Sequence, residues 1–184
     1  MSATFYVGAY WGARREDVEP CARRLQDFLE DLGCNIGIWN GGEPDSAGLS
    51  VHCGGYTAVP GILNNCVIHL PGMSAESEAL YEVGVARSLM AAVVECWEPD
   101  WATWTSHELR EALPFQTGEV IVGWMTYLSS SLLRRESRLP ALPNVEEVGD
   151  GVLITLGDDA AAVSADDVLA LRRSLGGAVA SEDV

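Results

Sequence analysis

The chain has 184 residues and a formal net charge of −16, because 27 acidic side chains face only 11 basic ones, all of them arginine. With 48% apolar and 21% charged residues, it has the composition of a globular protein and the length to form a core without a disulfide or a metal. This charge argues against direct binding to DNA, RNA or an anionic membrane, and the absence of lysine excludes a Walker A lysine and a Schiff-base lysine.

The N-terminal part predicts one strand, one helix and a small meander. Residues 4–10 are β-branched and aromatic, which is typical of a strand. Apolar side chains then recur at steps of three and four over residues 18–32, which predicts an amphipathic helix. Short strands are expected at residues 35–39, 49–53 and 66–70, because turns rich in Gly, Asn and Pro separate them.

The middle of the chain predicts a helix, a strand and a corner. Ser74 is a suitable N-cap for a helix over about residues 75–89. The apolar run at residues 91–97 is then interpreted as a strand, which Glu98-Pro99-Asp100 interrupts. Thr105-Ser106-His107-Glu108 is a capping-box pattern that predicts a short helix ending before Pro114.

The C-terminal part predicts a central strand, a hairpin and a last helix. Residues 119–128 carry apolar side chains on both faces of an expected strand, which places that strand in the middle of the sheet. Residues 129–143 are expected to form a loop. Gly149-Asp150-Gly151 predicts a hairpin between residues 145–148 and 152–156, and Ser164 is expected to cap a final helix.

Together these elements predict an α+β fold, with a mostly antiparallel sheet and two to three helices packed on it. We expect one domain over residues 1–184, in which residues 5–175 form the folded core and residues 176–184 a loose tail. Because the start of the chain lacks a signal-peptide pattern and no apolar run approaches 18 residues, we expect a cytoplasmic protein with reduced thiols and no membrane contact.

The first candidate functional site is a metal site. His52, Cys53, Cys66 and His69 have zinc-like spacings, but side chains alternate between the two faces of a strand. His52 and Cys53 should therefore point in opposite directions, as should Cys66 and His69. The sequence predicts neither a metal nor a cofactor.

Enzymatic sites are weakly indicated. The chain has neither a Gly-x-Ser-x-Gly motif nor a phosphate-binding loop, while a Cys–His pair that meets only in space stays open. Glu95, Glu98 and Asp100 lie beside three tryptophans, and glycosidases combine carboxylates with aromatic walls. A small glycosidase-like enzyme is therefore one alternative, and a plain acidic interaction domain is another.

Five short motifs occur in the order of a known family: Tyr6–Gly12, Trp39–Gly41, Cys53–Tyr56, Trp97–Trp101 and Gly123–Tyr127. In this order the chain resembles the immunity protein 52 family of bacterial polymorphic toxin systems, over about residues 5–175. The resemblance implies a non-enzymatic antitoxin, which binds and neutralises a secreted toxin that we expect to be a basic nuclease. It supplies no catalytic residues. The acidic surplus agrees with it, although solubility alone also explains that surplus.

The expected toxin-binding segment is the corner around Glu98-Pro99-Asp100. Pro99 and Asp100 suit a type I turn, and strand alternation should leave at least one nearby indole exposed. An exposed tryptophan beside carboxylates is typical of an interface hot spot, although all three tryptophans also fit a core. The acidic segments 43–45 and 146–150 are the next candidates. The predicted toxin-binding residues are Glu95, Trp97, Glu98, Asp100, Trp101 and Trp104.

Overall fold

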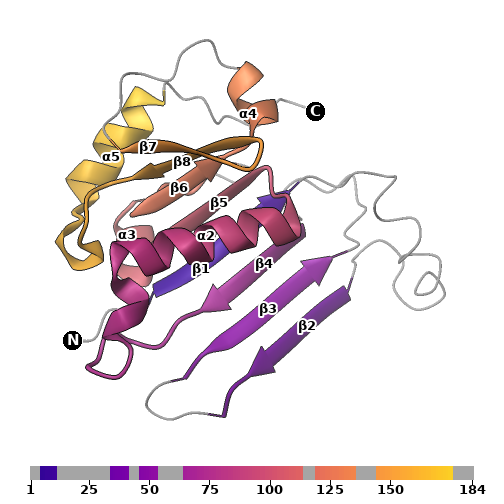
Figure 1. Ribbon diagram of the computed structural model, residues 1–184, viewed down its shortest axis with the longest axis vertical. Coiled ribbons are helices and arrows are strands. Elements are labelled where there is room, and N and C mark those ends of the chain that lie inside the picture. Colours follow the sequence, from indigo (N-terminus) through magenta and orange to yellow (C-terminus); the bar gives the residue numbers. More distant parts are fainter. Residues whose placement is uncertain are drawn as a thin grey trace.

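Eight strands form one sheet in which every neighbouring pair is antiparallel, in the order β2-β3-β4-β1-β5-β6-β8-β7 (Figure 1). The computed structural model describes residues 5–11, 34–41, 46–53, 64–113, 119–135 and 144–175. The strands are β1 (Phe5–Trp11), β2 (Cys34–Trp39), β3 (Gly48–Cys53), β4 (Asn64–His69), β5 (Trp101–Ser106), β6 (Met125–Leu128), β7 (Val145–Val148) and β8 (Gly151–Thr155). The helices are α2 (Val83–Trp97), α3 (His107–Ala112), α4 (Ser130–Arg135) and α5 (Ala165–Ser174), with 3-10 turns at Glu78–Tyr81 and Ala160–Ala162.

The predicted α+β class with a mostly antiparallel sheet is confirmed. The predicted strands near the N-terminus, the meander and the 145–156 hairpin are present within one or two residues of their expected bounds. Ser164 caps α5 as expected, because its hydroxyl accepts from the Asp167 amide while the Asp167 carboxylate accepts from the Ser164 amide. The helix predicted over residues 18–32 and the tail at 176–184 lie outside the described residues.

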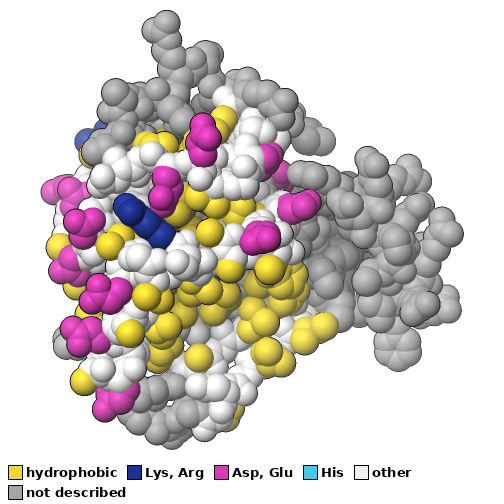
Figure 2. Space-filling view, viewed as in Figure 1, with side chains coloured by type: hydrophobic (Ala, Val, Ile, Leu, Met, Phe, Trp, Pro, Cys, Tyr) yellow, Lys and Arg dark blue, Asp and Glu magenta, His cyan; other side chains and the backbone are white. Residues whose placement is uncertain are grey.

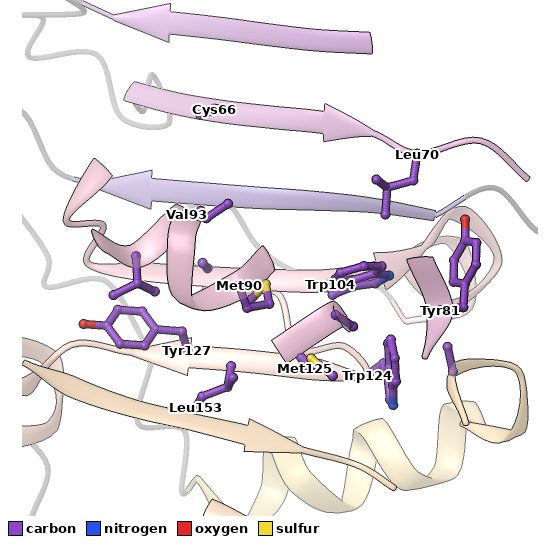
Figure 3. Packing of buried hydrophobic residues seen from close by; sticks show 14 residues of the cluster. Cys66, Leu70, Tyr81, Met90, Val93, Trp104, Trp124, Met125, Tyr127 and Leu153 are labelled. Carbon is purple, nitrogen blue, oxygen red and sulfur yellow. The ribbon is translucent and has the colours of Figure 1, made fainter. Parts of the chain in front are cut away.

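Helix α2 covers one face of the sheet. It crosses the front of the strands in Figure 1, and its buried residues Met90 and Val93 belong to one apolar cluster with side chains of β5, β6 and β8. Figure 3 shows Trp104, Tyr127 and Leu153 within this cluster. Trp104 has no exposed surface and contacts the Trp124 ring edge-on, with 5.5 Å between the ring centroids. A core this closely packed fixes the position of α2 on the sheet.

A second cluster occupies the opposite face of the same strands. Val168 and Leu171 of α5 pack there with Leu128, Ile154 and other buried residues. Strands β6 and β8 therefore bury both faces, which explains why β6 carries no polar face apart from the fully buried Thr126.

The boundaries of the helix before the corner were wrong in the prediction. Helix α2 begins at Val83 rather than near residue 75, and residues 91–97 continue it instead of forming a strand. Ser74 does not cap α2, because the N-cap of that helix is Glu82; the Ser74 amide donates to the hydroxyl of Ser77 in the turn before it. The stripe Ala86, Met90 and Val93 shows that the helical period continues through the apolar run.

Three further predictions need correction. Residues 101–106 form the fully buried strand β5, where the sequence predicted only a corner. The strand predicted over residues 119–128 is limited to Met125–Leu128, and the buried segment before it is irregular, with the Gly123 amide donating to the hydroxyl of Thr126. The predicted 129–143 loop contains α4.

Candidate functional site

The chain leaves α2 through an unusual residue. Glu98 adopts a left-handed conformation with φ 43° and ψ 52°, and its amide still donates to the Val94 carbonyl at 2.9 Å. Glycine is the usual residue at such a helix end, since a Cβ is disfavoured there. Pro99 follows and is buried, and β5 begins at Trp101. The chain changes direction at Glu98, and no hydrogen-bonded turn is present at Pro99 and Asp100, where a type I turn was predicted.

The three tryptophans of this segment lie in different surroundings. The side chain of Trp97 is 37% exposed at the end of α2. Trp101 is buried in the cluster under α5, and Trp104 is buried in the cluster under α2. One exposed indole was expected and is found, although the strand alternation used to predict it does not apply to a helix. The burial of Trp104 leaves it no surface with which to contact a partner, and that of Trp101 leaves it very little.

Two acidic segments meet at this end of the sheet. Glu95 and Glu98 are exposed and Asp100 is half-buried. The carbonyl of Asp100 accepts from the amide of Ser129, which follows β6. Asp150, in the turn between β7 and β8, accepts from the hydroxyl of Tyr127 at 2.7 Å.

Asp150 is held in place from two sides. Its second carboxylate oxygen accepts from the hydroxyl of Ser130 at 3.0 Å. The neighbouring Gly149, with φ 58°, packs so closely on α2 that a Cβ there would lie 2.9 Å from Cγ1 of Val94. The β7–β8 turn is thus fixed against the last turns of α2. We call the set Glu95, Trp97, Glu98, Asp100 and Asp150 the acidic corner.

The carboxylates of the acidic corner affect the pKa of the Tyr127 hydroxyl. Burial raises the pKa of its hydroxyl, and the hydrogen bond and charge of Asp150 and the charge of Asp100 raise this pKa further. The two carboxylates therefore act on the same buried phenol. Sequence reasoning placed Asp100 and Asp150 in separate candidate segments, since their proximity arises only from the pairing of β5, β6 and β8.

No zinc site was expected at His52, Cys53, Cys66 and His69. The strand register shows how two of these residues are placed. Cys66 lies opposite Val51, and His52 lies opposite Asn65, so Cys66 and His52 are on different faces. Cys66 is buried while His69 is exposed, and burial raises the pKa of the Cys66 thiol. Among the described residues, no group of three or more His, Cys, Asp or Glu side chains is arranged to hold a metal ion.

None of the helices in the described ranges combines the length and the apolar run that crossing a bilayer requires.

Comparisons with known proteins identify the chain. A solved structure of the Pseudomonas aeruginosa T6SS protein PA0821 has a similar fold, with a TM-score of 0.58 at 14% identity, over 96% of this chain and 73% of that one. The comparison with curated proteins gives no match. The family model described as "Immunity protein 52" matches residues 3–41 and 33–179, which is nearly the whole chain. The chain therefore belongs to the immunity protein 52 family, Imm52.

Proposed function

We propose that this protein neutralises its cognate toxin by forming a stoichiometric complex through the acidic corner, and that the toxin is a basic, nuclease-type protein. The family implies an immunity role and a toxin partner. The observation that supports the binding surface is the exposed indole of Trp97, with the exposed carboxylates of Glu95 and Glu98 beside it in the chain.

The chemistry of the corner suits a basic partner. An exposed indole supplies a large contact area, and carboxylates at its rim pair with arginine or lysine. The rings of Trp101 and Trp104 pack behind the surface, so they support the corner rather than contact the toxin. Asp150 belongs to the proposed surface because hydrogen bonds from Tyr127 and Ser130 hold its carboxylate in place. Its charge and that of Asp100 act on the same Tyr127 hydroxyl.

A nuclease is the toxin class that fits this charge best. The substrate channel of a nuclease must be positive to bind a polyanion, and a chain of charge −16 is complementary to such a channel. The same charge leads us to propose that the protein binds no nucleic acid itself. We place its action in the cytoplasm, where a nuclease toxin meets its substrate.

The protein is not an enzyme, because the immunity family is non-enzymatic. Glu95, Glu98 and Asp100 are therefore assigned to recognition, and the glycosidase-like alternative is set aside.

The test is co-expression with the toxin encoded by the neighbouring gene, followed by pull-down and a growth assay. Glu98→Arg and Trp97→Ala should each weaken the complex by about 2 kcal/mol or more, a loss of roughly 30-fold in affinity, with little change in melting temperature. Glu76→Arg is the matched control, since Glu76 is an exposed acid before the other end of α2. If neither corner variant changes affinity, the toxin binds elsewhere.

A further inference from the structure

Strand β2 forms one edge of the sheet, and its residues 35–39 are exposed. It pairs with β3 on one side, and within the described residues no strand pairs with its other side. Ile36 is 54% exposed, and Ile38 and Trp39 are each 62% exposed. An open edge with large apolar side chains is a ready template for another strand.

The two edges of the sheet are protected differently. The opposite edge, β7, carries Glu146 and Glu147, and charges of this kind discourage pairing with another chain. Strand β2 carries none, and between Leu32 and Ala75 the only charged side chains are Glu43 and Asp45. In a chain of charge −16, β2 itself carries no charged side chain.

An apolar surface adjoins this edge. Register places Ile36 opposite Val51 and Ile38 opposite Leu49, so all four side chains share one face. It is the face on which α2 lies, since Val51 and Leu49 pack against the α2 cluster. Figure 2 shows a hydrophobic area below α2 over these strands, with acidic side chains at its margins.

We propose that β2 is a self-association surface on which a second copy of this chain pairs antiparallel, joining two sheets edge to edge. A two-fold axis through Gly37 would set Ile36 opposite Ile38 of the second copy and Asn35 opposite its Trp39. In this register, Ile36 and Ile38 of one copy lie on the same face of the joined sheet as Ile38 and Ile36 of the other copy. The apolar areas of the two copies then form one continuous surface.

The charge distribution of the chain favours a second copy, rather than the toxin, as the partner that pairs with β2. Two copies of charge −16 repel each other wherever their carboxylates meet, and a charge-free edge is where they can approach. A basic toxin is instead attracted to the acidic surface, which β2 lacks. The two associations should therefore respond oppositely to salt: screening should strengthen the contact between copies and weaken the contact with toxin.

The first test is sedimentation velocity of the full chain over a range of protein concentrations and salt. We expect a concentration-dependent dimer that salt strengthens and that Ile38→Lys shifts to monomer by at least tenfold in dissociation constant. Val145→Lys is the matched control, because Val145 is also an exposed apolar residue on an edge strand. A monomer at all concentrations, or a dimer that Ile38→Lys leaves intact, overturns the proposal.

The second test reads the register directly. A Cβ added at Gly37 would have nothing within 4 Å, so Gly37→Cys should fold normally. Opposed Cβ atoms of an antiparallel pair lie about 4.5–5.5 Å apart, close to disulfide geometry. In a Cys96→Ser background, which removes an exposed thiol, Gly37→Cys should cross-link to dimer on oxidation well above the parent chain, and Val145→Cys should not.

Equal cross-linking of Gly37→Cys and Val145→Cys contradicts this register. Neither test contains toxin, so failure here leaves the proposed immunity function standing, and failure of toxin binding leaves the dimer standing.

Discussion

Glu98 occupies a backbone conformation that a residue with a side chain adopts at a cost. The left-handed region costs about 1–2 kcal/mol for such residues, and glycine is free of that cost. A carboxylate at this position projects from the end of α2 beside Trp97, inside the acidic corner. Strain retained at one residue is consistent with selection for binding rather than for stability.

We expect Glu98→Gly to raise the free energy of unfolding by about 1 kcal/mol, since it removes this cost. The same change should weaken toxin binding, because it removes a carboxylate from the corner. Thermal unfolding and a binding titration measure the two effects. Glu98→Ala is the control: it removes the carboxylate but keeps the Cβ, so affinity should fall without the gain in stability. Equal melting temperatures for the Gly and Ala variants would contradict this account.

Two buried tyrosines should make the fold sensitive to alkali. Burial raises the pKa of Tyr81 from 10.0 to about 12, and its hydroxyl donates to the Pro71 carbonyl. The pKa of Tyr127 is raised in the same direction. Because the folded chain holds these protons to a higher pH than the unfolded chain, their contribution to stability is complete below about pH 10 and is lost as pH rises through the folded values.

Denaturant unfolding from pH 8 to pH 12 measures this loss. We expect the free energy of unfolding to fall above pH 10, and to fall less steeply in Tyr81→Phe, whose side chain does not titrate. Stability that stays constant up to pH 12 in the parent chain would show that neither tyrosine is coupled to folding.

Gly151 and Gly84 lie in different elements, and replacing each tests a different effect: close backbone packing at Gly151 and helix propensity at Gly84. A Cβ at Gly151, the first residue of β8, would lie 2.1 Å from the carbonyl oxygen of Leu128, whereas a Cβ at Gly84 in α2 would have nothing within 4 Å. Gly151→Ala should therefore destabilise the protein strongly and disturb the turn that holds Asp150. Gly84→Ala should stabilise it by about 0.5–1 kcal/mol.

Circular dichroism melts of both variants measure this difference. A pair of variants with similar melting temperatures would show that β8 and β6 do not approach as closely as this geometry requires.

The strands were predictable where turn residues isolate them, as for β2, β3 and the β7–β8 hairpin. The region 75–106 was not, because a short apolar run such as Ala91–Val94 fits a buried strand and a buried helix equally well. No strand was predicted over Trp101–Ser106, although this segment is the strand that follows the helix.

The candidate site was predictable in part for the same reasons. Glu98-Pro99-Asp100 is typical of a chain reversal, so the sequence predicts a corner with acidic side chains there, and the role of this corner in toxin binding stays a prediction. Which tryptophan is exposed depends on where α2 ends. The approach of Asp150 to Tyr127 depends on strand pairing across 23 residues of sequence, which local patterns do not encode.

For the whole molecule, charge should govern how fast the protein meets its toxin. The net charge of −16 should steer encounter with a basic partner over distances comparable to the Debye length, about 8 Å at physiological ionic strength. We expect the association rate to fall steeply with added salt, while the dissociation rate changes little. Stopped-flow mixing at several salt concentrations measures both rates. An association rate that is indifferent to salt would contradict steering, though not the immunity role.

Strand β1 completes its pairing late during synthesis. This strand precedes both of its partners in the chain, since it pairs with β4 and β5, and Phe5 lies opposite Ser106. At about 5–20 residues per second, synthesis takes several seconds to reach that partner. The nascent chain must therefore leave the side of β1 that pairs with β5 unpaired until Ser106 has been made. A cell that meets its toxin during that interval depends on copies completed earlier, so protection should persist only while a standing pool of folded protein is maintained.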